Sequence, residues 1–478
     1  MSESIIEIQR HGMMYLFSSV GITIIGFFAT VFYAHWIGAE ILGKYFLFLS
    51  FLTIFSLFTD FGISYAGMYR ICEGIDPDRY FTAHLCLRFG LYFLLVTGLI
   101  ICHGYFHNLE ASGLFWVLIV VLGISTLQSS ISMGIGASNR LGLAASVSLL
   151  NNVARIIVQV ITVFLGFQVL GLVGGLAAGL IVEIIIDRKF IDYHIKKFEW
   201  DHVKNIFSFS SWAFLNTAGT IFFDNANLLI IAYFMPVSDV GIFGICWTFS
   251  FFALFVSTAL CNTLFVKVSR WNASGETNNI ALSLSRATTY AFIFAFPIFA
   301  GSFLLGYDLL YFLYGSSFAT GATALVIIIF MRIFQSLFQL YSNFLMATDH
   351  AKQAFIGMGI GIVLNILVAV ALIPIIGLAG AAVASLMNVI CSVIISHRYL
   401  KKIIPVIIEK RSITHIVAAT SVMAISLLII GQIPASRNVI HTALMVLIGA
   451  AIYFIILLKL NKNLREDVLR SLKIQWIM

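Results

Sequence analysis

Residues 318–346 read FATGATALVIIIFMRIFQSLFQLYSNFLM, and this stretch decides the fold class of the chain. It is longer than the roughly 20 mostly apolar residues with which an α-helix crosses a bilayer. A permanent cation, Arg332, lies near its centre, where a guanidinium costs about 3 kcal/mol unless it faces protein or water. We therefore expect a membrane-spanning helix packed inside a larger helical protein.

The rest of the chain has the composition of a polytopic membrane protein. Hydrophobic residues make up 60% of the 478 residues and charged residues 10%, whereas about 25% of the residues in a soluble domain are charged. We predict an all-α integral membrane protein with about 14 transmembrane helices, at 13–35, 44–66, 82–104, 114–135, 147–168, 170–188, 207–234, 240–266, 283–306, 318–346, 354–373, 378–397, 414–432 and 440–459. The short joints at 168–170 and 374–377 make twelve the alternative count.

The distribution of lysine and arginine predicts the orientation. With the N-terminus inside, 22 of the 28 basic residues fall in inside segments, four lie within helices, and only Lys44 and Arg437 fall outside. We expect a multi-pass protein of the inner (cytoplasmic) membrane with both termini cytoplasmic. The first helix is too long for the core of a signal peptide and should be retained. The net charge of +7 follows from this bias, so we expect basic segments to face anionic lipids and expect no nucleic-acid partner.

An internal repeat divides the chain into two lobes. The matching pairs of segments are 34–45 with 232–243, 137–140 with 347–350, and 171–178 with 377–384. Because each unit has six helices, both copies enter the membrane the same way round, and substrate sites of such repeats usually lie near the midplane. The predicted organisation is an N-lobe at 1–190, a cytoplasmic linker at 191–206, a C-lobe at 207–400, and two further helices with a tail at 401–478.

Buried charges are the candidate functional residues. Arg155 and Arg332 lie deep in their helices, where they either line a substrate cavity or form structural ion pairs. Arg88 is closer to a helix end, where its head can snorkel to the interface, and we keep it as a third candidate. The acids Asp60, Glu183 and Asp224 could pair with Arg155 or Arg332, or could carry a coupling proton or cation.

Polar stripes accompany these charges at helical spacing. They comprise Asn151, Asn152, Arg155 and Gln159; Asn216, Thr220, Asp224 and Asn227; and Arg332, Gln335, Gln339 and Asn343. Such stripes form either hydrogen bonds between helices or a wet lumen that binds sugars. We predict substrate binding by Arg332, Arg155, Arg88, Asn151, Asn152, Gln159, Gln335, Gln339 and Asn216. The six cysteines form no CxxC pair and the histidines are dispersed, so we expect no cofactor, no metal site and no catalytic residue.

Several motifs resemble one family of transporters. The segment Trp36–Tyr45, the segment Thr59–Ser64 followed by Arg70, and the segments Ala347–His350 and Ile376–Ala382 are similar to polysaccharide and O-antigen flippases. These flippases belong to the multidrug/oligosaccharidyl-lipid/polysaccharide exporter superfamily. The resemblance implies two six-helix lobes around a cavity that opens alternately to either side. It also implies a polyprenyl-diphosphate-linked oligosaccharide as substrate, a coupling ion (H⁺ or Na⁺), and polysaccharide polymerase and chain-length proteins as partners.

The physical chemistry of the stripes agrees with an anionic lipid substrate. Arginine binds phosphate through a bidentate fork, and amides exchange hydrogen bonds with sugar hydroxyls. A peptidoglycan-precursor flippase and a multidrug cation antiporter are the alternatives, although an antiporter should have a lumen dominated by carboxylates. A membrane polymerase or ligase would need a sizeable outer domain, and the predicted outer connections are short. We therefore expect a transporter and no enzyme.

Overall fold

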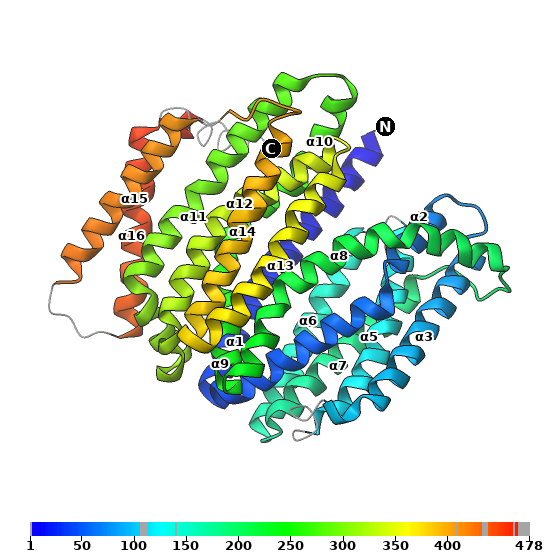
Figure 1. Ribbon diagram of the computed structural model, residues 1–478. Coiled ribbons are helices and arrows are strands. Elements are labelled where there is room, and N and C mark those ends of the chain that lie inside the picture. Colours follow the sequence, from blue (N-terminus) through cyan, green and yellow to red (C-terminus); the bar gives the residue numbers. More distant parts are fainter. Residues whose placement is uncertain are drawn as a thin grey trace. The chain divides into compact units, whose positions relative to one another are not determined.

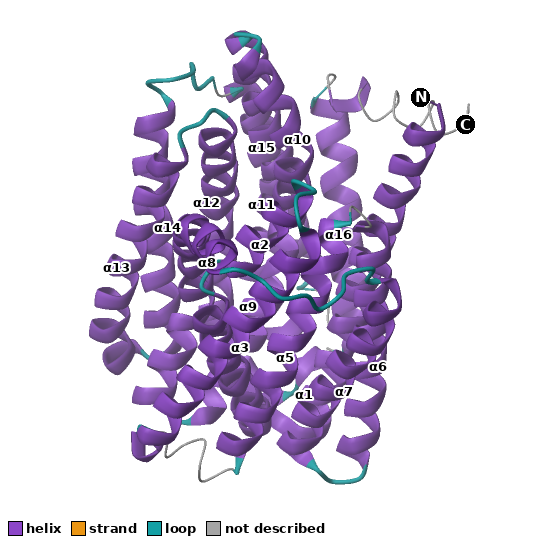
Figure 2. Ribbon diagram, turned by 90° about the vertical axis from the view of Figure 1, so that its right-hand side faces the viewer, coloured by secondary structure: helices purple, strands orange, loops and turns teal. Residues whose placement is uncertain are grey.

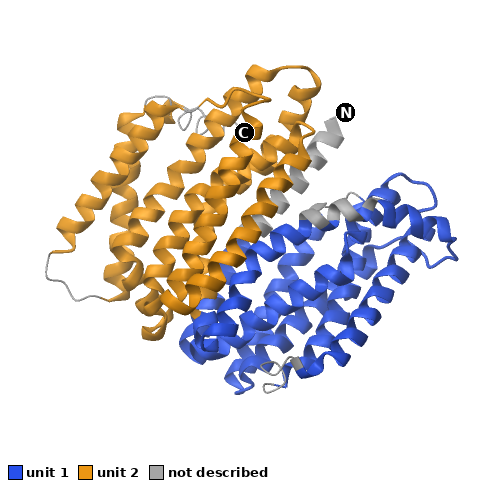
Figure 3. Ribbon diagram, viewed as in Figure 1, with its two compact units in different colours: residues 1–241 blue, residues 242–478 orange. Residues whose placement is uncertain are grey.

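The computed structural model describes residues 2–105, 113–138, 141–407, 409–432, 438–461 and 464–466. Throughout these ranges the chain is helical or in short connections, with no strand, which confirms the predicted all-α class (Figure 2). The chain forms two compact units, residues 1–241 and 242–478 (Figure 3). The predicted lobe boundaries at 190 and 207 stay a prediction.

Figure 1 labels the helices of the first unit. They are α1 (Ser2–Asp60), α2 (Ile63–Cys72), α3 (Pro77–Ile101), the 3₁₀ turn η1 (His103–Tyr105), α5 (Leu114–Ala137), α6 (Leu141–Phe164), α7 (Gln168–Asp187), the 3₁₀ turn η2 (Arg188–Phe190) and α8 (Trp200–Phe234). Helix α8 packs on α1, α2 and α3 within this unit.

The second unit begins inside α9 and continues to the C-terminal helices. Its elements are α9 (Val237–Ser250), η3 (Phe251–Leu254), α10 (Phe255–Ala273), α11 (Thr277–Tyr314), η4 (Ser316–Gly321), α12 (Ala322–Ala347), α13 (Ala351–Ile376), α14 (Leu378–Leu400), α15 (Lys410–Ile430) and α16 (Val439–Leu460). Helix α12, which carries Arg332, packs against α10, α11, α13 and α14.

Every predicted transmembrane stretch lies mostly on helix, but the described residues do not confirm the predicted number of crossings. Over the described ranges, twelve helical stretches are long and apolar enough to cross a membrane. The first two predicted helices form one continuous stretch, and α8 is not among the twelve. The two short joints are real breaks, because α6 ends at Phe164 before α7 begins at Gln168, and Gly377 separates α13 from α14. The count of about 14 therefore stays a prediction.

Helix α1 is sharply bent at Gly38. Its φ of 74° and ψ of −178° are not helical, and this backbone region is essentially restricted to glycine. The side chain of Gln159 contacts both arms, since it lies 2.8 Å from the Tyr33 hydroxyl and 3.1 Å from the Tyr45 hydroxyl. Twelve residues of straight helix would separate these tyrosines by about 18 Å, so the chain turns back on itself at the bend.

Glycines bring helices into close contact in both units. A β-carbon on Gly175 of α7 would lie 2.3 Å from Cγ of Gln159 and 2.8 Å from the Arg155 carbonyl oxygen on α6. A β-carbon on Gly361 of α13 would lie 2.2 Å from Oδ1 of Asn388 on α14. Small residues let helices approach closely where lipid supplies no hydrophobic drive for association. In unit 1, this packing places the polar stripe of α6 against α7.

Candidate functional site

Each unit carries its own polar cluster, built from residues that the stripes predicted. The cluster in unit 2, which we call the Arg332 cage, consists of Arg332, Trp247, Ser250, Phe251 and Gln335. The cluster in unit 1, which we call the α6–α7 polar face, consists of Asn151, Asn152, Arg155, Gln159 and Glu183.

Arg332 is completely buried, with an exposed fraction of 0%. Its guanidinium carbon lies 4.2 Å from the centre of the Trp247 ring and 4.3 Å from that of Phe251. Its Nε donates to Ser250 Oγ at 2.9 Å, and Nη1 donates to Gln335 Oε1 at 2.5 Å. A desolvated cation–π contact contributes about 2 kcal/mol. The two rings and the polar contacts together offset the free energy of placing the cation at this depth.

The Arg332 cage is located at a break in a helix. The sequence predicts one helix over 240–266, whereas α9 ends at Ser250 and a 3₁₀ turn precedes α10. The Nη2 group of Arg332 lies 3.5 Å from the Trp247 carbonyl in the last turn of α9, and a cation is favoured at that end of a helix dipole. On the far side of the break, Ser257 Oγ is 3.0 Å from Gln339 Oε1. Two members of the predicted α12 stripe thus contact the interrupted helix.

The α6–α7 polar face contains an amide whose hydrogen-bonding groups are all satisfied and an arginine whose Nε has no partner. Gln159 accepts from Tyr33 and donates to Tyr45 and to the Leu172 carbonyl, so its amide is satisfied inside the protein. Arg155 is half-buried and donates from Nη2 to Asn152 Oδ1 at 2.7 Å. Its Nε is buried and has no hydrogen-bond partner. Among the described residues, Arg155 makes no ion pair.

Glu183 lies with a second acid that sequence reasoning missed. Asn151 donates to Glu183, and Asp187, one turn further along α7, accepts from Ser132 at 2.7 Å. The other oxygen of Asp187 is buried without a hydrogen-bond partner. Glu183 therefore does not pair with Arg155 in this structure. The spacing of four residues between the two acids was the sequence signal that could have identified Asp187.

Arg88 and Asp60 form a buried ion pair of 3.1 Å. Arg88 is 3% exposed and also donates to Ser64 Oγ at 2.8 Å, so the expectation that its head snorkels to the interface is wrong. Asp60 also accepts from the backbone amides of Gly62 and Ser64 at the start of α2. Pairing of Asp60 with Arg155 or Arg332 was one alternative from the sequence, and in the structure Asp60 pairs instead with Arg88, which joins α3 to the α1–α2 turn.

The remaining predicted residues lie on α8. Asp224 is half-buried in the middle of that helix, and its neighbour Asn225 donates to the Ile221 carbonyl. The side chain of Asn216 lies outside the described residues. The predicted stripe on α8 consequently stays a prediction.

The fold is that of membrane transporters. A solved structure described as the lipid II flippase MurJ in an inward closed conformation has a TM-score of 0.75 and 16% identity, covering 93% of this chain and 98% of that one. An inward-facing multidrug resistance MATE family transporter has a TM-score of 0.61 and 14% identity, covering 80% of this chain and 95% of that one. At these identities the likeness establishes the fold.

The family follows from a match along the sequence. The family described as "Polysaccharide biosynthesis protein" matches residues 32–323, more than half of the chain, and the chain belongs to this family. Two similar proteins of Haloferax volcanii are the probable low-salt glycan biosynthesis flippase Agl15 and the probable flippase AglR. Agl15 is 24% identical over 93% of this chain and 94% of its own length. AglR is 26% identical over 85% of this chain and 86% of its own length. The chain is thus a multi-pass membrane protein of the polysaccharide biosynthesis family.

Proposed function

We propose that this protein translocates a polyprenyl-diphosphate-linked oligosaccharide from the cytoplasmic to the outer leaflet by alternating access. The membership of the polysaccharide biosynthesis family and the flippase names of both relatives support this substrate class. In the proposal the protein resides in the inner membrane with both termini cytoplasmic. It delivers units for a surface polysaccharide of the O-antigen or capsule type to a polymerase and its chain-length proteins.

Arg155 is the observation that carries the proposal. It is a half-buried guanidinium on an apolar helix whose Nε has no hydrogen-bond partner and which makes no ion pair within the described ranges. A diphosphate supplies both the charge and the acceptor oxygens that such a group lacks. Asn152, already bonded to Arg155, would orient the fork, and Asn151 would bind sugar hydroxyls. Gln159 bonds to Tyr33 and Tyr45 on the two arms of the α1 bend, so in the proposal it supports substrate binding indirectly.

Arg332 plays a different part in the proposal. In this structure the Arg332 cage encloses the guanidinium, so contact with substrate requires Trp247 and Phe251 to move. Because both belong to the segment where α9 is interrupted, a change at that break would release the cation. A 3₁₀ stretch within a helix often marks such a hinge. Gln335 and Gln339 would be exposed with it.

The experiment compares lipid-linked oligosaccharide in cells that carry substituted proteins. A strain without the gene should accumulate undelivered lipid-linked oligosaccharide, and Arg155→Gln should do the same at normal protein level. The matched control is Arg286→Gln, since Arg286 is an exposed arginine of unit 2. Accumulation of a peptidoglycan precursor would assign the alternative substrate. Normal surface glycan combined with sensitivity to cationic drugs would assign the antiporter function and contradict the proposal.

A further inference from the structure

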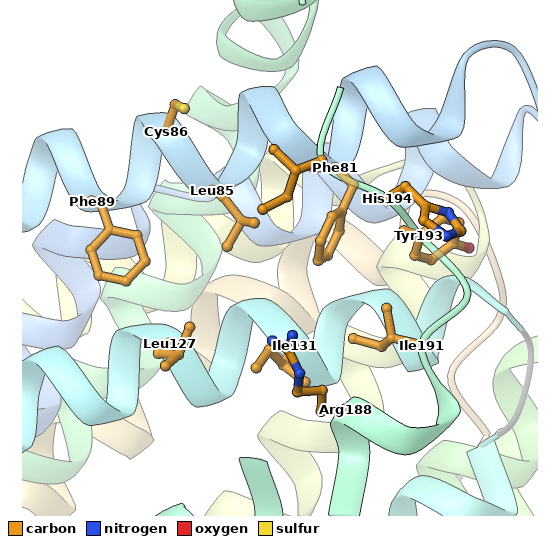
Figure 4. Close-up of a pocket in the computed structure, with 11 residues that line it drawn as sticks. Phe81, Leu85, Cys86, Phe89, Leu127, Ile131, Arg188, Ile191, Tyr193 and His194 are labelled. Carbon is orange, nitrogen blue, oxygen red and sulfur yellow. The ribbon is translucent and has the colours of Figure 1, made fainter. Parts of the chain in front are cut away.

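Unit 1 contains a groove that the transport proposal does not use. It has a volume of about 640 Å³, lies between α3 and α5, and includes residues that follow α7. Figure 4 shows Phe81, Leu85 and Phe89 projecting from α3 toward the helix that carries Leu127 and Ile131. Such a volume is typical of sites that take drug-sized molecules.

A short strap closes one end of the groove, and hydrogen bonds fix it in place. The strap, residues 191–196, is not helical. Its His194 amide donates to Asp78 Oδ1 at 3.0 Å, and its Lys196 amide donates to Thr82 Oγ1 at 3.0 Å. Tyr193 stacks on Phe81 with ring centres 5.5 Å apart. The groove therefore has a built wall at the end where α3 begins and α7 finishes.

At that end of the groove, Arg188 carries a positive charge that can bind an anionic group. Lys196 is neutralised by Asp78 at 2.5 Å, whereas Arg188 lines the groove, is exposed and makes no ion pair in the part of the chain that the structure describes. Figure 4 shows the Arg188 side chain extending from the end of α7 toward the same space. His194 lies at the same end. An apolar slot with a cation at its mouth complements an amphiphile whose head is anionic.

We propose that this groove binds an anionic membrane phospholipid, with one acyl chain between α3 and α5 and the phosphate on Arg188. The apolar walls bind the acyl chain equally well whatever the headgroup is. Arg188 then supplies the selectivity, because a basic side chain near an anionic headgroup contributes about 1 kcal/mol. This free energy corresponds to a preference of roughly 5-fold for an anionic over a zwitterionic lipid.

Native mass spectrometry of the full-length protein, titrated with phosphatidylglycerol or phosphatidylcholine, tests the proposal. The wild type should retain phosphatidylglycerol roughly 5-fold better than phosphatidylcholine. Arg188→Gln should lose this preference and keep the binding of phosphatidylcholine. Lys189→Gln is the matched control, because Lys189 is an exposed neighbouring cation that does not line the groove, and it should keep the preference.

Filling the groove tests the place of the acyl chain. Leu127→Trp should reduce the retention of both lipids, and Leu127→Phe serves the same purpose if the larger side chain prevents folding. Equal lipid preference in Arg188→Gln and Lys189→Gln would overturn the role of Arg188. If the Leu127 variants retained both lipids as well as the wild type does, the groove would not be the lipid site. Displacement of phosphatidylglycerol by equimolar polyprenyl phosphate would assign the groove to the transported lipid and overturn the choice of occupant.

Discussion

At the scale of single residues, the cation at position 332 shows what a sequence does and does not predict. The apolar residues on either side of Arg332 predict that it lies deep in a membrane-spanning helix. Its partners could not be predicted, because Trp247 and Ser250 lie more than 80 residues earlier and neither glycine nor proline marks the end of α9. Lysine keeps the charge but lacks the flat fork that contacts two rings and three oxygens together. We expect Arg332→Lys and Trp247→Leu each to lower the midpoint of thermal unfolding of the purified protein. Because both remove the same contact, the double variant should unfold little below the worse single variant. Additive losses, or an equal loss in the exposed control Arg286→Lys, would contradict the Arg332 cage.

At the scale of elements, the sequence predicts where helices lie and misses how they bend and meet. Apolar stretches of membrane length locate the helices, since each must satisfy its own backbone in lipid. The predicted loop at 36–43 is instead helix with one aberrant residue, Gly38, because a single glycine with positive φ suffices to turn the chain. We expect Gly38→Ala to cost about 1–3 kcal/mol of folding free energy, from backbone strain rather than crowding. A β-carbon there would meet no atom within 4 Å, and the same holds for Gly26 in the same helix, where φ is ordinary. Gly26→Ala is therefore the matched control and should leave the yield of monodisperse protein unchanged. Equal yields for both variants would show that the bend tolerates a side chain.

At the scale of the whole molecule, the proposed substrate sets the driving force. Each negative charge that leaves a cell through an inside-negative potential releases about 2.3 kcal/mol per 100 mV, so a diphosphate could be exported without ATP. Glu183 and Asp187 offer a second source of drive, because two neighbouring carboxylates on α7 could exchange a proton or cation. The two sources of drive can be distinguished by measuring transport of a fluorescent lipid-linked oligosaccharide in proteoliposomes. A potassium gradient with valinomycin sets the membrane potential. We expect transport to quicken as the substrate side is made more negative, and this response to persist in Glu183→Gln. A transport rate that responds to a pH gradient in the wild type but not in Glu183→Gln would add proton coupling through α7. Transport that ignores both gradients would contradict a charged lipid as the transported species, because moving net charge through a potential always changes its free energy.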